Sequence, residues 1–178
     1  MLIYGATNHI GKLATHIFAK NGYSLILVDS SLDKLQKLRD TMARVFPHMG
    51  NEVQNRIHLL NLNFAIWKDS TSLEYKIREV IDLEKQVPIL VNCMSFLNEW
   101  QVCEDKLFHE VQFDQIYQYT ANTLIGYSVL LNFFTRMLVH KKHQSCLINI
   151  TKKEVKPWDR TSYAMAMLRV MYYPIYYH

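Results

Sequence analysis

The chain has 178 residues, of which 49% are hydrophobic and 20% charged, and its formal net charge is +4. A chain of this length and apolar content can bury one sizeable core, so we expect a single domain over residues 1–178 and exclude a disordered protein. The three cysteines form no Cys-x-x-Cys pair, which argues against a disulfide framework or a zinc site. No apolar run approaches the ~18 residues of a membrane-spanning helix, and the lysines are spread thinly. We therefore expect no transmembrane segment and no nucleic-acid partner.

Short apolar runs alternate with segments of helical periodicity along the chain. In chain order, the predicted strands are Met1–Tyr4, Tyr23–Val28, Arg56–Leu62, Ile89–Asn92 and Cys146–Thr151. The predicted helices are Gly11–Asn21, Asp33–Val45, Ser70–Leu83, Glu104–Phe108, Phe113–His140 and Ser162–Tyr173. This order predicts an α/β fold, a doubly wound parallel sheet of the Rossmann-like type with helices on both faces. We expect it to be truncated after the fifth strand and the following helix, with an aromatic tail at 172–178.

The first turn has the pattern of a dinucleotide-binding loop. A strand leads into Gly5 and a helical pattern opens at Gly11, and such glycines let the backbone approach a pyrophosphate and let strand and helix pack closely. His9 stands where the middle glycine belongs, and its Cβ is expected to crowd that approach. The turn therefore predicts a nucleotide-binding frame with weak or lost binding.

Asp29 follows directly after the second predicted strand. An acidic residue at this position accepts hydrogen bonds from an adenosine ribose and repels a 2′-phosphate, so NAD is favoured over NADP if a dinucleotide binds. The alternative is that Asp29 caps the next turn, together with Ser30 or Ser31.

These motifs, in this order and spacing, resemble the short-chain dehydrogenase/reductase family. The branch of the hydroxysteroid dehydrogenases and 3-oxoacyl-CoA reductases, with its inactive relatives, is the most similar. Residues 5–12 resemble the family's G-A-T-D-G-I-G-K, with Tyr4 in place of the preceding threonine, and residues 92–95 stand where the family has N-N-A-G, with Ser95 in place of its glycine. Asn122 matches a helix asparagine whose local kink and water connect to the catalytic lysine in the family. The resemblance implies cofactor contacts at Gly5, His9, Ile10, Gly11, Asp29, Asn63 and Asn92.

The resemblance also implies catalytic positions at Tyr163, Asn122 and Thr151, but two key residues differ. At the position of the family's Y-x-x-x-K motif, this chain has Met167 in place of the lysine, and Lys152 stands at the position of the catalytic serine. The lysine lowers the tyrosine's pKa, and without a cation nothing lowers a tyrosine's pKa from ~10. These substitutions predict that Tyr163 is not a working acid/base at neutral pH.

We therefore expect a catalytically inactive homologue, without a cofactor, that acts as a structural or accessory subunit of a larger protein assembly. Inactive relatives in mitochondrial and membrane-bound settings favour a mitochondrial membrane complex, with the cytoplasm as the other location. The expected partner surfaces are the sheet edge, the helices bearing Asn122 and Tyr163, and the aromatic tail. Two alternatives stay open. One is an NAD-dependent oxidoreductase remodelled around Tyr163, Thr151 and Lys152, and the other is a non-catalytic NAD(H)-binding module using Gly5, Gly11, Asp29 and Asn92.

Overall fold

The computed structural model describes residues 1–46, 56–66, 70–80, 89–94, 112–141 and 146–150. Within these residues, the strands are β1 (Leu2–Tyr4), β2 (Leu25–Asp29), β3 (Ile57–Asn61), β4 (Ile89–Asn92) and β5 (Cys146–Asn149). The helices are α1 (His9–Lys20), α2 (Leu32–Val45), α4 (Ser70–Val80), α5 (Phe113–Thr120) and α6 (Gly126–Lys141), and a π-helical turn, η4 (Ala121–Ile125), joins α5 to α6. The predicted helices at 104–108 and 162–173 and the tail at 172–178 lie outside the described residues.

The five strands form one parallel sheet in the order β3-β2-β1-β4-β5. The predicted doubly wound parallel sheet is confirmed. β1 lies at the centre, with Leu2 paired to Ile26 of β2 on one side and to Leu90 of β4 on the other. The chain builds the sheet outward from β1 in one direction and then in the other. The change of direction places a crevice beyond the carboxyl ends of β1 and β4, where open α/β folds bind their ligands.

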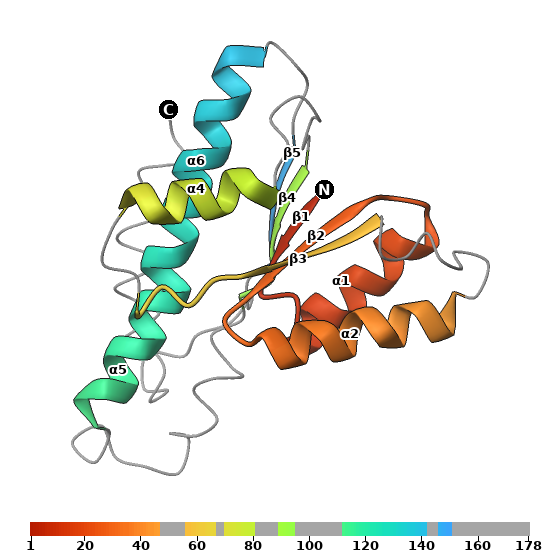
Figure 1. The fold of residues 1–178 in the computed structure, drawn as a ribbon, viewed down its shortest axis with the longest axis horizontal. Helices are drawn as coiled ribbons and strands as arrows, with labels where there is room; N and C mark the ends of the chain where they lie inside the picture. The colour runs from red at the N-terminus through yellow and green to blue at the C-terminus, as the bar shows by residue number, and fades with distance from the viewer. Residues whose placement is uncertain (47–55, 67–69, 81–88, 95–111, 142–145, 151–178) are drawn as a thin grey trace.

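Helices cover both faces of the sheet (Figure 1). α1 and α2 lie on one face, over a core that includes Ile3, Leu27 and Leu35. α4, α5 and α6 lie on the other face, over a core that includes Tyr4, Leu60 and Leu130. Successive residues of a strand point to opposite faces, so a strand buried on both sides is apolar throughout. This explains why continuous apolar runs mark the strands in the sequence.

The predicted helix Phe113–His140 is divided by η4 into α5 and α6. Several other element boundaries also differ from the sequence prediction, and two of these differences have local reasons. α1 begins at His9 rather than Gly11, because the side chain of Asn8 accepts a hydrogen bond from the Gly11 N–H at 2.6 Å and caps the helix. β2 begins at Leu25 rather than Tyr23, because the end of α1 extends further. Gly22 has φ +81°, and the Tyr23 N–H donates to the Phe18 carbonyl at 3.1 Å, which is the pattern of a Schellman motif. Tyr23 therefore belongs to the helix cap.

Candidate functional site

The turn after β1 is held by packing at both of its glycines. Gly5 has φ +74°, and a Cβ there would lie 2.8 Å from the Met94 sulfur and 2.9 Å from the Met94 nitrogen. A Cβ on Gly11 would overlap the Gly5 carbonyl and the backbone of Ala6, so only glycine lets α1 approach β1 this closely. Close packing alone therefore accounts for both glycines, and Met94 from the β4 loop lies against the turn.

Asn8 connects this turn to the end of β4. Its side-chain oxygen accepts from Gly11 N–H, and its amide nitrogen donates to the Cys93 carbonyl. The bridge crosses between the first β–α turn and the loop after β4, which is the position of the ligand crevice in this class of fold. His9, the first residue of α1, has an exposed side chain, and Ile10 is half-buried against the core on the α1 face.

Asp29 is bonded by its own chain. One carboxylate oxygen accepts from the Thr7 N–H at 3.0 Å and the Thr7 hydroxyl at 2.8 Å, and the other accepts from the Ser30 N–H at 2.8 Å. The cap of α2 is Ser31, whose hydroxyl accepts from the Lys34 N–H at 3.4 Å. A ribose hydroxyl would have to compete for the Asp29 carboxylate with these Thr7 and Ser30 donors and with the Ser30 hydroxyl, which lies 3.5 Å from the second oxygen.

Asn122 lies in η4 and is the centre of a buried polar cluster. Its side-chain oxygen accepts from the Phe64 N–H at 2.8 Å, and its amide donates to the Asn63 side-chain oxygen at 3.2 Å and to the Gln118 carbonyl at 3.1 Å. The structure thus brings together Asn63 and Asn122, two of the predicted site residues. A π-turn leaves backbone groups out of the regular α-helical ladder, and π-turns are frequent at functional sites.

Tyr4 completes this cluster. Its hydroxyl donates to the backbone carbonyl of Asn122, and the residue is only 2% exposed. Its ring meets Phe64 edge to face, with centroids 6.1 Å apart at 87°. A Cβ on Gly126 would overlap both the Tyr4 hydroxyl and the Phe64 ring, so the tyrosine fits because residue 126 is glycine. The family that this sequence resembles has a threonine at position 4, so the phenol hydroxyl that reaches the Asn122 carbonyl is a feature of this chain.

Asn92 stabilises the ends of β4 and β5. Its side-chain oxygen accepts from the Met94 N–H at 3.1 Å, and its amide donates to the Asn149 side-chain oxygen at 3.3 Å. Asn149 in turn accepts from the Tyr127 hydroxyl at 2.5 Å. Asn92 is therefore tied to the sheet and to α6 through side-chain hydrogen bonds.

Cys93, directly after β4, is a free and fully buried thiol. Burial raises its pKa from the ordinary value of 9.0 to about 12, because the thiolate loses its hydration. It is therefore an unreactive thiol at neutral pH. In the part of the chain that the structure describes, no three His, Cys, Asp or Glu side chains gather in a way that would hold a metal ion.

The remaining catalytic positions, Tyr163, Met167, Thr151 and Lys152, lie outside the described residues, as does Ser95. Among the described helices, none combines the length and the apolar character that crossing a membrane requires.

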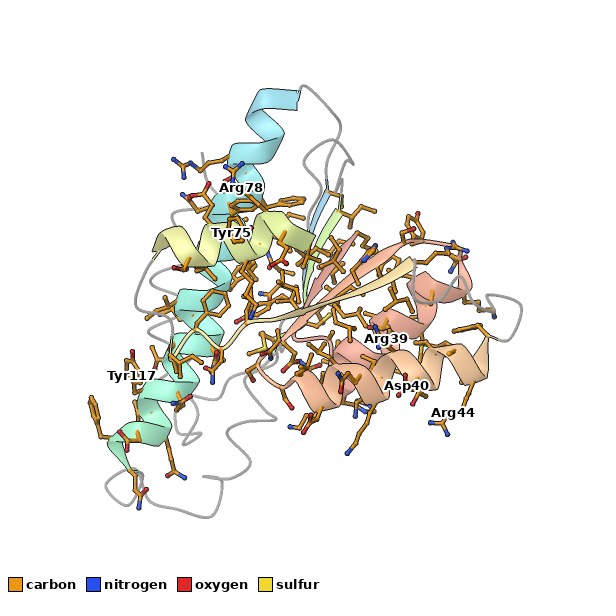
Figure 2. The ribbon with its side chains drawn as sticks, viewed as in Figure 1. Arg39, Asp40, Arg44, Tyr75, Arg78 and Tyr117 are labelled. Carbon is orange, nitrogen blue, oxygen red and sulfur yellow. The ribbon has the colours of Figure 1, made fainter. Side chains whose placement is uncertain are left out.

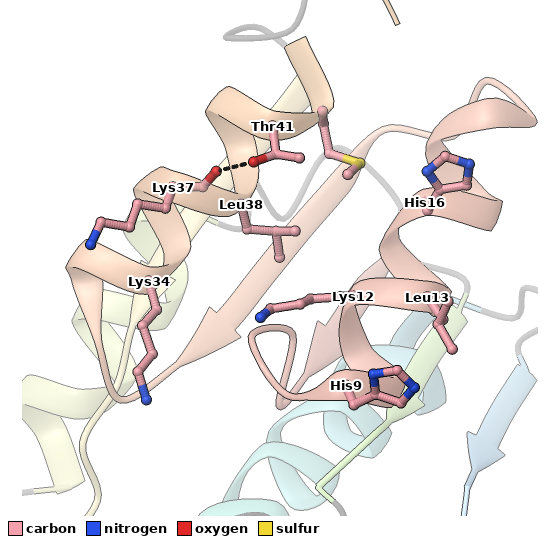
Figure 3. Close-up of a pocket in the computed structure, with 9 residues that line it drawn as sticks. His9, Lys12, Leu13, His16, Lys34, Lys37, Leu38 and Thr41 are labelled. Carbon is pink, nitrogen blue, oxygen red and sulfur yellow. Dashed lines mark hydrogen bonds between the residues drawn. The ribbon is translucent and has the colours of Figure 1, made fainter. Parts of the chain in front are cut away.

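The structure also contains a groove that the sequence analysis does not identify. It lies between α1 and α2 and has a volume of about 550 Å³ (Figure 3). Its lining residues are His9, Lys12, Leu13, His16, Lys34, Lys37, Leu38, Thr41 and Met42. One sequence feature could have pointed to this groove, which is that α1 contains no Asp or Glu. The other lysines of the groove lie on α2, a separate helix, so the sequence alone does not bring them together with α1.

No family model matches the sequence. Solved structures do resemble the fold. A metagenomic short-chain oxidoreductase in complex with NADP has a TM-score of 0.69 at 15% identity, over 98% of this chain and 73% of that one. Serine dehydrogenase from Escherichia coli has a TM-score of 0.67 at 15% identity, over 98% of this chain and 73% of that one. A beta-ketoacyl-ACP reductase from Bacteroides thetaiotaomicron has a TM-score of 0.65 at 21% identity, over 97% of this chain and 68% of that one.

The chain therefore has the fold of the short-chain dehydrogenases/reductases, as the sequence resemblance predicts. Among curated proteins, a very-long-chain 3-oxoacyl-CoA reductase-like protein of Arabidopsis thaliana is 42% identical over 48 residues. This match covers 27% of this chain and 15% of that protein, and it supports the 3-oxoacyl-CoA reductase branch. The chain covers 51% of a short-chain dehydrogenase from Sphingobium yanoikuyae in complex with NADPH.

Proposed function

We propose that this chain is a catalytically inactive homologue of the short-chain dehydrogenases/reductases. It serves as a structural or accessory subunit of a larger protein assembly, with a mitochondrial membrane complex as its setting. The observation that carries the proposal is that polar groups corresponding to the family's cofactor and proton-transfer positions are bonded to one another. The Tyr4 hydroxyl binds the Asn122 carbonyl, and Thr7 binds the Asp29 carboxylate.

The bond between Tyr4 and Asn122 bears on proton transfer. The resemblance implies a proton relay at Asn122, and the buried Tyr4 hydroxyl already takes up one of the two acceptor positions of the Asn122 carbonyl. The sequence adds Met167 at the position of the family's lysine, which removes the cation at the far end of the same relay. Both changes act on one chemical step, and this agreement supports inactivity more strongly than either change does alone.

The bridge from Asn8 and the side chain of Met94 bear on cofactor binding. Both lie at the mouth of the crevice between β1 and β4, where a dinucleotide would pass. The family's motif has an alanine at position 94, and a methionine fills more of this space. These contacts favour a turn that packs against its own chain over a turn that cradles a pyrophosphate.

Exposed apolar side chains support a partner-binding role. Phe113 is 77% exposed, and Tyr117 and Ile125 are also exposed, all on the continuous α5–η4 segment that carries Asn122. Tyr117 extends outward from α5 (Figure 2). In the related family this helix forms part of the main subunit interface, and clustered exposed apolar residues mark interaction surfaces. We assign this surface to a protein partner.

An NAD-dependent oxidoreductase with a remodelled site, or a non-catalytic NAD(H)-binding module, is the alternative. The positive φ of Gly5 and the cap at Asn8 favour it, because they keep the backbone form of a phosphate-binding turn, and two solved relatives were determined with NADP or NADPH. If this alternative holds, a ribose hydroxyl has to share the Asp29 carboxylate with the Thr7 and Ser30 donors or displace one of them.

Turnover and assembly state together test the proposal. The full chain is assayed with NADH or NADPH and a 3-oxoacyl-CoA, and an epitope-tagged copy is followed on native gels of fractionated cells. We expect no turnover and migration with a large assembly in the mitochondrial membrane fraction. Turnover that disappears in Tyr163→Phe would overturn inactivity, and migration as a free monomer would overturn the accessory role.

A further inference from the structure

The groove between α1 and α2 is cationic along its rim. Lys12 reaches from α1 towards α2, whereas Lys34 and Lys37, which also line the groove, extend from the outer side of α2 away from α1 (Figure 3). His9 and His16 add two imidazoles from α1. α1 has no acidic residue, and the two acidic residues of α2, Asp33 and Asp40, do not line the groove. In the described part of the chain, the rim therefore carries only positive or neutral side chains.

The floor of the groove is apolar. The buried Leu38 and Met42 form it, and Leu13 lines the groove on its α1 side. The apolar surface continues on α1, where Leu13 is 53% exposed and Ile17, one turn further, is 55% exposed. Leu13 and Ile17 lie on one face of the helix because residues four apart are neighbours on its surface. An apolar floor with a cationic rim is the complement of an amphipathic segment that carries acidic residues.

We propose that this groove binds an acidic, amphipathic helical segment of a partner protein. A helix fits between two helices by packing its side-chain ridges into the groove between them, and helix-in-groove binding uses apolar anchors at positions i, i+3/i+4 and i+7. The apolar anchors would contact Leu13, Leu38 and Met42, and carboxylates on the flanks would face Lys12, Lys34 and Lys37. This inference deepens the proposed accessory role and rests on it.

The shape of the groove favours a protein segment over two other anionic partners, a membrane surface and a nucleic acid. A membrane surface is broad, so its headgroups would reach the rim lysines but its plane would not enter a groove between two helices. A nucleic acid would engage the lysines through phosphates and would gain nothing from the leucine and methionine floor. The groove is also on the opposite face of the sheet from Phe113 and Tyr117, so it adds a second contact to the surface assigned above.

The test uses the full chain and a fluorescein-labelled synthetic helix with leucines on one face and glutamates on the other. The charge-reversal variant Lys12→Glu/Lys34→Glu changes one rim lysine on each helix. The matched control Lys20→Glu/Arg44→Glu makes the same change of charge on the same two helices outside the groove, with Arg44 pointing outward from α2 (Figure 2). Circular dichroism and thermal melting establish that both variants fold. We expect the first variant to weaken binding by at least ~10-fold and the control by less than about twofold.

Three further probes decide between occupants. A helix with lysines in place of the glutamates should bind only the charge-reversal variant. Polyglutamate binding as strongly as the amphipathic helix would show that charge alone acts and would overturn the proposal, as would stronger binding to phosphatidylserine vesicles or to RNA. Equal binding by wild type and charge-reversal variant would also overturn it, while co-migration of the chain with a large assembly would leave the accessory role standing. Conversely, groove-specific binding by a chain that is monomeric in cells would contradict the accessory role alone.

Discussion

The hydrogen bond from Tyr4 to the Asn122 carbonyl makes a sharp prediction for Tyr4→Phe. The substitution keeps the ring and its edge-to-face contact with Phe64, and removes only the hydroxyl from a buried carbonyl. Leaving a buried acceptor short of a donor costs ~1–3 kcal/mol of the free energy of unfolding. For a domain of this size that lowers Tm by roughly 2–12 °C. Urea unfolding followed by far-UV circular dichroism measures the change, with the m-value expected to stay constant.

Tyr23→Phe is the matched control. Tyr23 also makes an edge-to-face contact, with Phe18 at 5.6 Å and 89°, but its side chain is partly exposed. We expect loss of the Tyr23 hydroxyl to change the free energy of unfolding by no more than ~0.5 kcal/mol. If Tyr4→Phe is equally mild, the hydroxyl is not committed to the Asn122 carbonyl, and the main structural support for inactivity is lost.

A double-mutant cycle tests the geometry further. Gly126→Ala places a Cβ against the Tyr4 hydroxyl and the Phe64 ring, and overpacking of this kind costs ~1–3 kcal/mol. Tyr4→Phe removes one of the two overlapping groups, so the double variant should be more stable than the sum of the single losses predicts, by ~0.5 kcal/mol or more. Strict additivity would contradict the contact between residues 4 and 126.

Four other predictions concern single residues of the site. Asp29→Asn weakens the bonds from Thr7 and Ser30 and should cost ~1.5–3 kcal/mol in urea unfolding, and an unchanged midpoint would contradict the internal role of this carboxylate. The buried Cys93 thiol should resist iodoacetamide in the native chain while the exposed Cys146 reacts, as peptide mass spectrometry of native and urea-unfolded samples can establish. Because folding raises the pKa of Cys93 to about 12 from 9.0, the unfolded chain releases this proton first, so its stabilising contribution is complete below about pH 9 and is lost as the pH rises towards 12. The fall in Tm between pH 8 and pH 10 should therefore be smaller in Cys93→Ala. Gly11→Ala should destabilise by at least ~1–3 kcal/mol, because its Cβ meets rigid backbone, and a fully stable variant would show that α1 can move away from β1.

The order of the elements could be predicted from the sequence because buried parallel strands are apolar on both faces. Leu25–Val28 is such a run, and it lies in β2 as expected. The start of β2 could not be predicted in the same way, because an aromatic residue such as Tyr23 fits a buried strand as well as a helix cap. Its place in the α1 cap depends on the backbone bond to Phe18 that Gly22 permits.

The partners of the site residues could not be predicted from spacing. Asn63 and Asn122 each match a family position, but their contact depends on how the α5–η4–α6 segment lies on the sheet. The sequence shows that Tyr4 replaces a threonine, and only the fold shows that its hydroxyl reaches the Asn122 carbonyl beside Gly126. The α1–α2 groove was missed for the same reason, because Lys12 and Lys34 meet only when the two helices pack side by side.

Direct titration with the dinucleotide tests the central claim. The claim is that the polar groups at the family's cofactor and proton-transfer positions are hydrogen-bonded within the chain and do not bind a cofactor. The full chain is titrated with NADH and with NADPH in a calorimeter, beside an active beta-ketoacyl-ACP reductase as positive control. We predict no binding to the chain at cofactor concentrations up to about 1 mM. A dissociation constant of about 1 mM corresponds to a binding free energy of about −4 kcal/mol, so any affinity should be weaker than this. Saturable binding in the micromolar range that Asp29→Ala abolishes would contradict the account, because it would mean that the Asp29 carboxylate is available to hold a ribose.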